Sequence, residues 1–283
     1  MGLPMAMNLM KSGFVVTGFS LDGMDKFAAA GGKVANSPRD AASGRSIVIT
    51  CLPGSAAVLN QVLEGEDGLL AGVGRDAILI ETSTHPIEAK RRAADQLAGK
   101  GAVFLECEMS GVPPMVAARR CVFFISGGTR ETFEKCLPVF DAITATEKRY
   151  LGKFGTATRM KLVNNLLTCV HIAAAAEVLA LGIKAGLDPD DMLALFGAGA
   201  GSSAMFVQRG PLMVRRKFDE SEGPFDSLAK LPPAIQALAA QVAAATPILD
   251  AAAALYSKAL ADGRGQQDVA AMIEIIESLS RPA

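Results

Sequence analysis

The chain has 283 residues, with 28 basic and 29 acidic side chains and a formal net charge of −1. This balance gives no electrostatic reason to expect nucleic acid or an anionic membrane as a partner, and we expect neither. Half of the residues are hydrophobic, but aromatic residues make up only 5% and tryptophan is absent. The length suffices for one large domain or two ordinary ones, each with a sizeable core.

Up to about Tyr150, short β-type runs alternate with helical stretches. The runs SIVIT and AILIE are continuously apolar, which indicates strands buried on both faces of a parallel sheet. The alternation predicts an α/β Rossmann-type doubly wound sheet as a dinucleotide-binding domain over residues 1–151. We expect strands at 14–19, 46–51, 77–81, 103–106 and 121–126, and helices at 22–30, 55–63, 86–97 and 130–140.

After Gly155 the pattern is helical throughout, which predicts an all-α C-terminal domain over residues 152–283 for substrate binding and dimerisation. Alanine lets helices approach closely, so we expect a homo-oligomer formed through this half. The segment 162–183 is long and apolar, but it contains Asn164, Asn165, His171 and Glu177, which are costly in a bilayer. We interpret it as the buried central helix of a soluble protein. Helices are expected at 160–184, from 188, and at 235–244, 248–261 and 269–278.

The five cysteines are scattered, form no C-x-x-C pair and are accompanied by only two histidines. We therefore expect no metal site. Buried free thiols in a reducing compartment are the simplest interpretation. No signal-peptide pattern opens the chain, so the expected location is the cytoplasm.

The opening MGLPMAMNLMKSGF contains only one glycine, Gly2, that could belong to a phosphate-binding G-x-G-x-x-G turn. The wider pattern MG-x-PMA-x-NL-x-K-x-G resembles the opening of the β-hydroxyacid dehydrogenase family, in which a strand and two further glycines lie upstream. The resemblance implies that this central strand is absent here, which would separate its neighbours and expose their ladder groups. We favour an internal methionine of a longer protein over a truncated, inactive product. A later glycine-rich run, 197–203, follows a helix instead of a strand, and we interpret it as a helix connection.

Further motifs of the family follow in order along nearly the whole chain. In ITCLPGSAAV, Leu52 and Pro53 resemble the loop beneath the nicotinamide. In ETSTHP, Thr84 lies at the carboxyl edge of a strand, where open α/β sheets bind ligands; a helix cap before Pro86 is an alternative role, and both roles can coexist. ECEMSGVPP resembles the substrate loop, and it keeps Ser110 and Gly111 for a carboxylate. This loop departs from the usual D-A-P-V-S-G-G at Glu106, Cys107, Glu108 and Val112, and Arg119-Arg120 is also unusual.

The motif GTATRMKLVNNLL places Lys161 and Asn165 on one helix face with Asn164 and Thr168, between apolar neighbours. We expect this polar stripe to face a closed cleft; a solvated face is the alternative. The resemblance assigns the catalytic lysine to Lys161 and the substrate amide to Asn165. A partly desolvated lysine can act as a general acid or base near neutral pH.

The segment FDSLAKLPP resembles the family's K-D-L segment near the nicotinamide, with Lys230 in place. Leu231 stands where aspartate is usual, and we expect the two following prolines to disturb the helix start. At the expected end of the second strand, Ser20 takes the position of the acid that binds the ribose of NAD, with Asp22 close by. Leu21 replaces the arginine typical of NADP enzymes, so we expect NAD, with NADP as the alternative.

The sequence thus resembles 3-hydroxyisobutyrate dehydrogenase-like enzymes, above all the L-threonate dehydrogenase branch. The implied reaction is NAD(P)-dependent oxidation of a small hydroxy acid, with Lys161 as general acid/base. Two alternatives stay open: a catalytically degraded dinucleotide-binding or scaffold protein, and a reductase of small aldehydes on the same fold. Lys161 argues against an imine reductase, because imine reductases of this architecture usually lack that lysine.

Overall fold

The computed structural model describes residues 1–219 and 223–280. It divides into two compact units, Met1–Lys161 and Leu162–Ala283. The border expected at 151/152 falls in the loop between β7 (Lys148–Tyr150) and α9 (Thr156–Lys184). The observed border lies ten residues further along the chain, after Lys161, because the first turn of α9 is hydrogen-bonded to the sheet of the first unit.

The main sheet of the first unit has the order β3-β4-β5-β6-β7. Strands β3, β4 and β5 are parallel and in register, with Ile47 opposite Ile78 and Ile78 opposite Val103. Strand β6 runs antiparallel to β5, unlike a fully parallel sheet, because the connection contains only the five-residue helix α7 and is too short for the usual crossover. The remaining bounds are β3 (Ile47–Thr50), β4 (Ile78–Glu81), β5 (Val103–Ser110), α7 (Pro113–Ala117) and β6 (Val122–Ser126).

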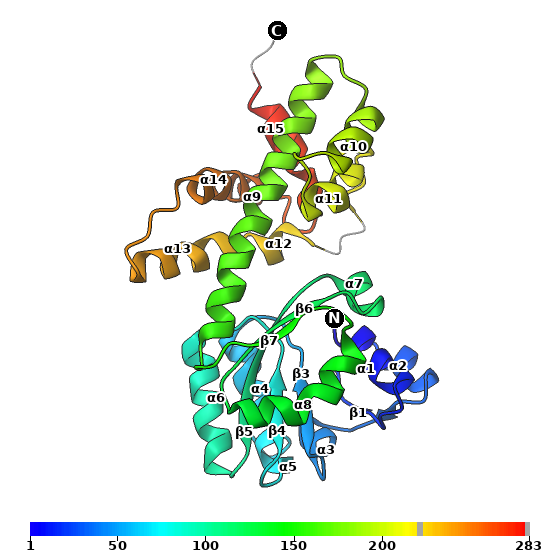
Figure 1. Ribbon diagram of the computed structural model, residues 1–283, viewed down its shortest axis with the longest axis vertical. Helices are drawn as coiled ribbons and strands as arrows, with labels where there is room; N and C mark the ends of the chain where they lie inside the picture. Colours follow the sequence, from blue (N-terminus) through cyan, green and yellow to red (C-terminus); the bar gives the residue numbers. More distant parts are fainter. Residues whose placement is uncertain (220–222, 281–283) are drawn as a thin grey trace. The chain divides into compact units, whose positions relative to one another are not determined.

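Helices cover both faces of this sheet, as the doubly wound prediction requires (Figure 1). Along β4, Ile78 and Ile80 pack against α1 and α8, whereas Leu79 between them packs against α4 and α6. Alternate side chains of a strand point to opposite faces, so both cores are anchored on the same strand. The helices are α1 (Gly2–Lys11), α3 (Pro38–Ala42), α4 (Ala56–Leu63), α5 (Leu69–Gly72), α6 (Ile87–Gly99) and α8 (Arg130–Ile143).

The first two strands form a separate sheet. β1 (Thr17–Gly18) pairs in parallel only with β2 (Lys33–Val34), and α2 (Asp25–Ala29) connects them. The strand expected over 14–19 is thus shortened to two residues. Within the described residues no ladder joins β1 to β3, and the hydroxyls of Thr17 and Thr50 are buried without a partner. The two-stranded sheet and the main sheet are therefore separate within the described residues.

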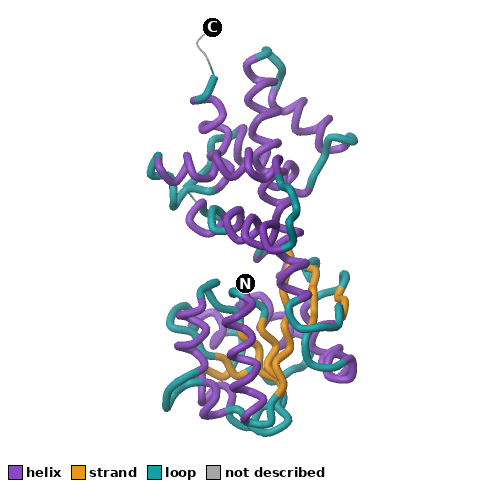
Figure 2. The backbone as a smooth tube through the Cα atoms, turned by 90° about the vertical axis from the view of Figure 1, so that its left-hand side faces the viewer, coloured by secondary structure: helices purple, strands orange, loops and turns teal. Residues whose placement is uncertain are grey.

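The second unit is helical in every described element, as predicted, whereas the strands lie in the first unit (Figure 2). Its core packs Ile172, Ala176 and Leu179 of α9 against Phe225 and Tyr256. The glycine-rich run 197–203 connects α10 to α11, and the Ser203 side chain accepts a hydrogen bond from the Phe206 amide (3.0 Å) at the start of α11. The helices are α10 (Pro189–Ala198), α11 (Ala204–Val214), α12 (Phe225–Leu228), α13 (Leu231–Gln241), α14 (Pro247–Ala261), η1 (Val269–Ala271) and α15 (Met272–Ser278).

Helix α9 is long and apolar enough to cross a membrane by length and composition alone, with 29 residues and an 18-residue window of mean hydropathy 2.0. A core helix of a soluble protein has the same properties. The fully buried side chains of Cys169, Ile172 and Leu179 belong to the helical core, which favours the interpretation of α9 as a central core helix.

Candidate active site

The loops that follow β3, β4 and β5 meet at one edge of the sheet, because the carboxyl ends of parallel strands share an edge. The Leu52 amide donates to Ser83 Oγ (2.7 Å), and Thr82 Oγ1 donates to the Thr50 carbonyl (2.7 Å). A Cβ atom on Gly54 would lie only 2.6 Å from the Thr84 carbonyl oxygen. The loops carrying Leu52, Pro53 and Thr84 therefore pack directly against one another.

The Thr84 side chain is hydrogen-bonded to a buried carboxylate. Its hydroxyl donates to Glu108 Oε2 (2.7 Å), whereas α6 starts at Ile87 after Pro86 with no side-chain cap. The alternative role of Thr84 as a helix cap is therefore wrong. Ser110 ends β5 two residues after Glu108, and Gly111 follows it; both are partly buried. The predicted substrate loop and the Thr84 loop are thus connected through Glu108.

Beneath this edge lies a cluster of buried charged groups, in which Lys90 of α6 meets three glutamates of β4 and β5. Lys90 Nζ lies 2.6 Å from Glu108 Oε1, 3.1 Å from Glu81 Oε2 and 4.0 Å from Glu106 Oε1. All four side chains are fully buried. Burying a charge is costly unless it is paired and hydrogen-bonded, so these groups need each other.

Neighbouring donors satisfy the glutamates. Glu106 accepts hydrogen bonds from the Gly155 amide (2.8 Å) and from the hydroxyls of Ser126 and Thr158. The Ser83 amide donates to Glu81 Oε1 (2.8 Å). The second Glu81 oxygen has only the Lys90 ion pair, whose geometry is not that of a hydrogen bond.

Lys90 and Glu81 were not predicted as site residues from the sequence, and Glu106 and Glu108 were noted there only as departures from a motif. The signal was present, because AILIE and FLECE carry acids inside otherwise apolar, buried strands. Such an acid calls for a cationic partner. Nothing local in the sequence indicates that the partner lies on α6.

Two pKa values follow from this arrangement. Burial alone would lower the pKa of Lys90, but the charges of Glu108, Glu81 and Glu106 together outweigh it and raise the pKa above its ordinary value of 10.5. Burial, reinforced by the Lys90 charge, lowers the pKa of His85 to about 4, although Glu108 acts in the opposite direction. At neutral pH the site therefore holds an ammonium at Lys90 and an uncharged imidazole at His85.

The first turn of α9 joins the same cluster. Thr158 Oγ1 lies 3.0 Å from Glu108 Oε1 and 3.3 Å from Lys90 Nζ, and the Ala157 amide donates to Ser126 Oγ (3.0 Å). Lys161 follows Thr158 by three residues on the same face of the helix, and is partly buried. Asn165 is one further turn along α9 and is buried. The structure thus holds the turn before Lys161 against the carboxyl end of β5.

The residues predicted to bind the dinucleotide include several at helix starts and in the loop after β1. Gly2 is the first residue of α1, and Met1 before it provides no side-chain cap; the Gly2 amide faces the Cys51 thiol, and the Met5 amide donates to the Met1 carbonyl (3.4 Å). Ser20 and Asp22 are exposed in the loop after β1, and the Asp22 amide donates to Ser20 Oγ (3.4 Å). Lys230 is exposed immediately before α13. That helix starts at Leu231 with its prolines in the first turn, where proline is tolerated, so the expected disturbance is not seen.

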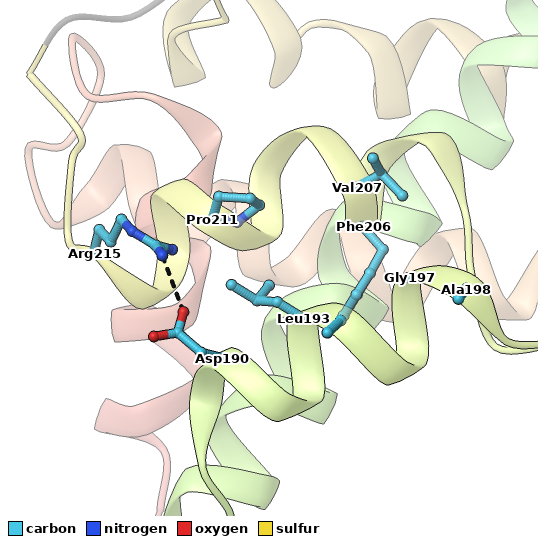
Figure 3. A pocket seen from close by; sticks show the side chains of 9 residues that line it. Asp190, Leu193, Gly197, Ala198, Phe206, Val207, Pro211 and Arg215 are labelled. Carbon is cyan, nitrogen blue, oxygen red and sulfur yellow. Dashed lines mark hydrogen bonds and ion pairs between the residues drawn. The ribbon is translucent and has the colours of Figure 1, made fainter.

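A surface pocket in the second unit contains none of the predicted site residues (Figure 3). It lies between α10 and α11, where Leu193 and Phe206 line it and Arg215 pairs with Asp190 (3.0 Å) at one end. Its apolar lining and exposed ion pair give it no group suited to acid–base chemistry. The candidate active site is therefore the sheet edge with the start of α9.

Comparisons with known proteins agree with this assignment of the fold. Residues 1–155 match the NAD-binding domain of 6-phosphogluconate dehydrogenase, and residues 155–276 match the NAD-binding domain of NADP-dependent 3-hydroxyisobutyrate dehydrogenase. The chain is 29% identical to L-threonate dehydrogenase of Cupriavidus necator over its full length and 95% of that protein. It is 29% identical to glyoxylate/succinic semialdehyde reductase 2 of Arabidopsis thaliana over 98% of the chain and 77% of that protein. A solved 3-hydroxyisobutyrate dehydrogenase from Salmonella typhimurium superposes with a TM-score of 0.89 at 25% identity, covering 97% of this chain and 95% of that one.

Proposed function

This chain belongs to the β-hydroxyacid dehydrogenase family, and from that premise we propose that it oxidises a small hydroxy acid related to L-threonate or 3-hydroxyisobutyrate. Membership makes it an NAD(P)-dependent hydroxyacid dehydrogenase; the choice of substrate is the proposal. It is supported by similarity to L-threonate dehydrogenase over the whole chain. The retained Ser110-Gly111 turn at the end of β5 offers a hydroxyl and an amide for the substrate carboxylate.

Lys161 is the proposed general acid/base. As the hydroxyl-bearing carbon loses its hydride, the Lys161 amine takes the hydroxyl proton, and it returns a proton in the reverse direction. Ser110, Gly111 and Asn165 would hold the carboxylate and hydroxyls. The bound nicotinamide supplies the hydride acceptor.

One observation carries this proposal: the Thr158 hydroxyl, one turn before Lys161, is bonded to the carboxylates of Glu106 and Glu108. An α-helix rises about 1.5 Å per residue, so the Lys161 backbone lies about 4.5 Å along the helix from the hydrogen-bonded Thr158. The anchoring strand is the one that ends at Ser110. Lys161 and the proposed carboxylate site are therefore tied to the same strand end.

The chain's residues fit a dinucleotide. The start of α1 at Gly2 is the proposed position of the pyrophosphate, and the exposed Asp22 carboxylate suits the hydroxyls of a ribose. Since no arginine occupies the loop after β1, we propose NAD as the preferred cofactor, with NADP as the alternative. The residues that would hold it are Gly2, Ser20, Asp22, Leu52, Pro53, Thr84 and Lys230.

The test combines binding and turnover. NADH titration of the purified chain, followed by a panel of hydroxy acids including L-threonate and 3-hydroxyisobutyrate, should give binding and then NAD reduction. Lys161→Ala should lower kcat by about 10²–10⁴-fold while leaving the Kd for NADH unchanged. Lys153→Ala, at an exposed lysine before α9, is the matched control. A fully active Lys161→Ala enzyme would remove Lys161 from the reaction.

A second candidate runs the same chemistry in reverse, as NAD(P)H-dependent reduction of a small aldehyde. Similarity to two glyoxylate/succinic semialdehyde reductases of Arabidopsis thaliana over 98% of the chain favours it. Oxidation of NADH with glyoxylate or succinic semialdehyde, faster than NAD reduction with any hydroxy acid, would select this direction. Binding of NADH without turnover in either direction would instead select the scaffold alternative.

We also propose a cytoplasmic homo-oligomer that binds neither nucleic acid nor membrane. The five free cysteines support a reducing compartment. Exposed apolar side chains on α9, among them Val163, Leu167 and Leu181, support a helical interface between copies. Light scattering coupled to size-exclusion chromatography tests the assembly, and a monomer at micromolar concentration would contradict it.

A further inference from the structure

Glu108 contacts three different groups with its two oxygens. Oε1 lies 2.6 Å from Lys90 Nζ and 3.0 Å from Thr158 Oγ1, and Oε2 accepts the Thr84 hydroxyl at 2.7 Å. The side chain is fully buried, so no solvent competes for these contacts. Glu108 stands where the family motif has proline, so this link belongs to this chain's own departure from the motif.

The link fixes the polarity of the Thr84 hydroxyl. A hydroxyl carries one proton and two acceptor lone pairs. The Thr84 proton is committed to Glu108, because a carboxylate can only accept. The same Thr84 oxygen can then only accept a hydrogen bond from a ligand.

We propose that Glu108 is a specificity-determining positioning residue that acts through Thr84. It makes the Thr84 hydroxyl bind a hydrogen-bond donor, the amide NH₂ of a nicotinamide, in preference to an anionic group. This inference rests on the proposed function in one respect, the binding of a nicotinamide dinucleotide near Thr84.

Replacing Glu108 by glutamine should invert this polarity. The amide would turn its carbonyl toward the Lys90 ammonium and its NH₂ toward Thr84, because two donors cannot face each other. The glutamine NH₂ would donate to Thr84 Oγ1, and the Thr84 proton would become free to point at the ligand. Thr84 would then suit a ligand acceptor.

The experiment compares Kd values for NAD and for nicotinic acid adenine dinucleotide, in which a carboxylate replaces the carboxamide. Wild type should bind NAD more tightly than nicotinic acid adenine dinucleotide. Glu108→Gln should reduce the ratio of the Kd for nicotinic acid adenine dinucleotide to the Kd for NAD by about 10-fold, the usual scale of one hydrogen bond to a charged group. Glu88→Gln, the same change at an exposed glutamate of α6, should leave the ratio at the wild-type value.

Thr84 variants separate the polarity effect from a general loss of structure. Thr84→Val should lose the discrimination, and Thr84→Ser, which keeps the hydroxyl, should retain it. Adding Glu108→Gln to Thr84→Val should cause no further change in the ratio, because Glu108 acts through the hydroxyl. The two single Thr84 variants test the inference even where Glu108→Gln folds poorly, which a circular dichroism melting curve of Glu108→Gln reports.

The outcomes are distinguishable. If Glu108→Gln or Thr84→Val weakens both dinucleotides equally and leaves their ratio unchanged, the inference is overturned and the proposed function stands. If wild type binds neither dinucleotide, the proposed function fails and the inference fails with it. A reduced ratio in Glu108→Gln that disappears in the Thr84→Val background supports the inference.

Discussion

Substituting Lys90 with methionine should destabilise the sheet unit more than almost any other single change. The variant keeps a side chain of similar length but removes the only cation within 4.0 Å of Glu81, Glu106 and Glu108 among the described residues. Each of these contacts corresponds to an attraction of about 4 kcal/mol or more at an effective dielectric constant near 20. Desolvation offsets much of this attraction, and the three carboxyls retain other donors. We therefore expect a loss of about 3–5 kcal/mol, the range for breaking a buried ion pair from one side.

Urea unfolding and thermal melting measure this loss. For a unit of 161 residues, Met1–Lys161, it corresponds to a drop in melting temperature of roughly 10 °C. Tryptophan is absent and each unit contains one tyrosine, so in a Tyr256→Phe background the fluorescence of Tyr150 reports the sheet unit alone. Lys135→Met, at the exposed ion pair with Glu131 (2.9 Å), is the matched control and should melt like wild type.

The pH dependence provides a second check. The raised pKa of Lys90 means that its stabilising contribution is present below 10.5 and is lost as the pH rises above that value. The stability difference between wild type and Lys90→Met should therefore shrink in alkaline solution. A loss below about 1 kcal/mol at pH 7, the scale of a surface pair, would refute the reasoning that this cluster depends on its one cation.

Two further predictions follow from the same edge of the sheet. Because the pKa of His85 is lowered to about 4 from 6.5, the folded state resists protonation; its contribution is complete above pH 6.5 and is lost as the pH falls toward 4, and His85→Gln should flatten the stability curve in that window. An unchanged curve in the variant would assign the acid sensitivity to other groups. Gly54→Ala should weaken NAD binding and cost about 1–3 kcal/mol, the scale of overpacking, because its Cβ would meet the Thr84 carbonyl at 2.6 Å. Gly74→Ala, where an added Cβ meets nothing within 4 Å, is the control, and equal effects of the two substitutions would contradict the close packing of these loops.

The sequence predicts the elements whose signal is local. Continuous apolar runs predicted β3 and β4 to within a residue, and the change of pattern after Gly155 predicted the helical second unit. The short strands β2 and β7 were not predicted, because the two residues of β2 and the polar sequence KRY of β7 carry no apolar periodicity. The antiparallel direction of β6 was also missed, because strand direction depends on the length of the connection instead of the composition of the strand.

The candidate site also contains residues with a local sequence signal and residues without one. Motif resemblance selected Thr84, Ser110 and Lys161 because their neighbours along the chain form a recognisable pattern. The Lys90 cluster joins residues 81, 90, 106, 108 and 158, whose contacts span up to 68 positions along the chain. No single segment contains enough of the cluster to predict it, since only the parallel pairing of β4 with β5 brings the glutamates together.

The divided sheet has a consequence for behaviour in solution. Among the described residues, strand β3 pairs with β4 alone, and its residues Ile47, Val48 and Ile49 are partly exposed. A strand edge without a ladder partner is a template on which another chain can add a strand, and no proline interrupts this one. Purification of the 283-residue chain should therefore be limited by concentration-dependent fibrous or amorphous precipitation through this edge, and a peptide that pairs with the edge should keep the protein dispersed.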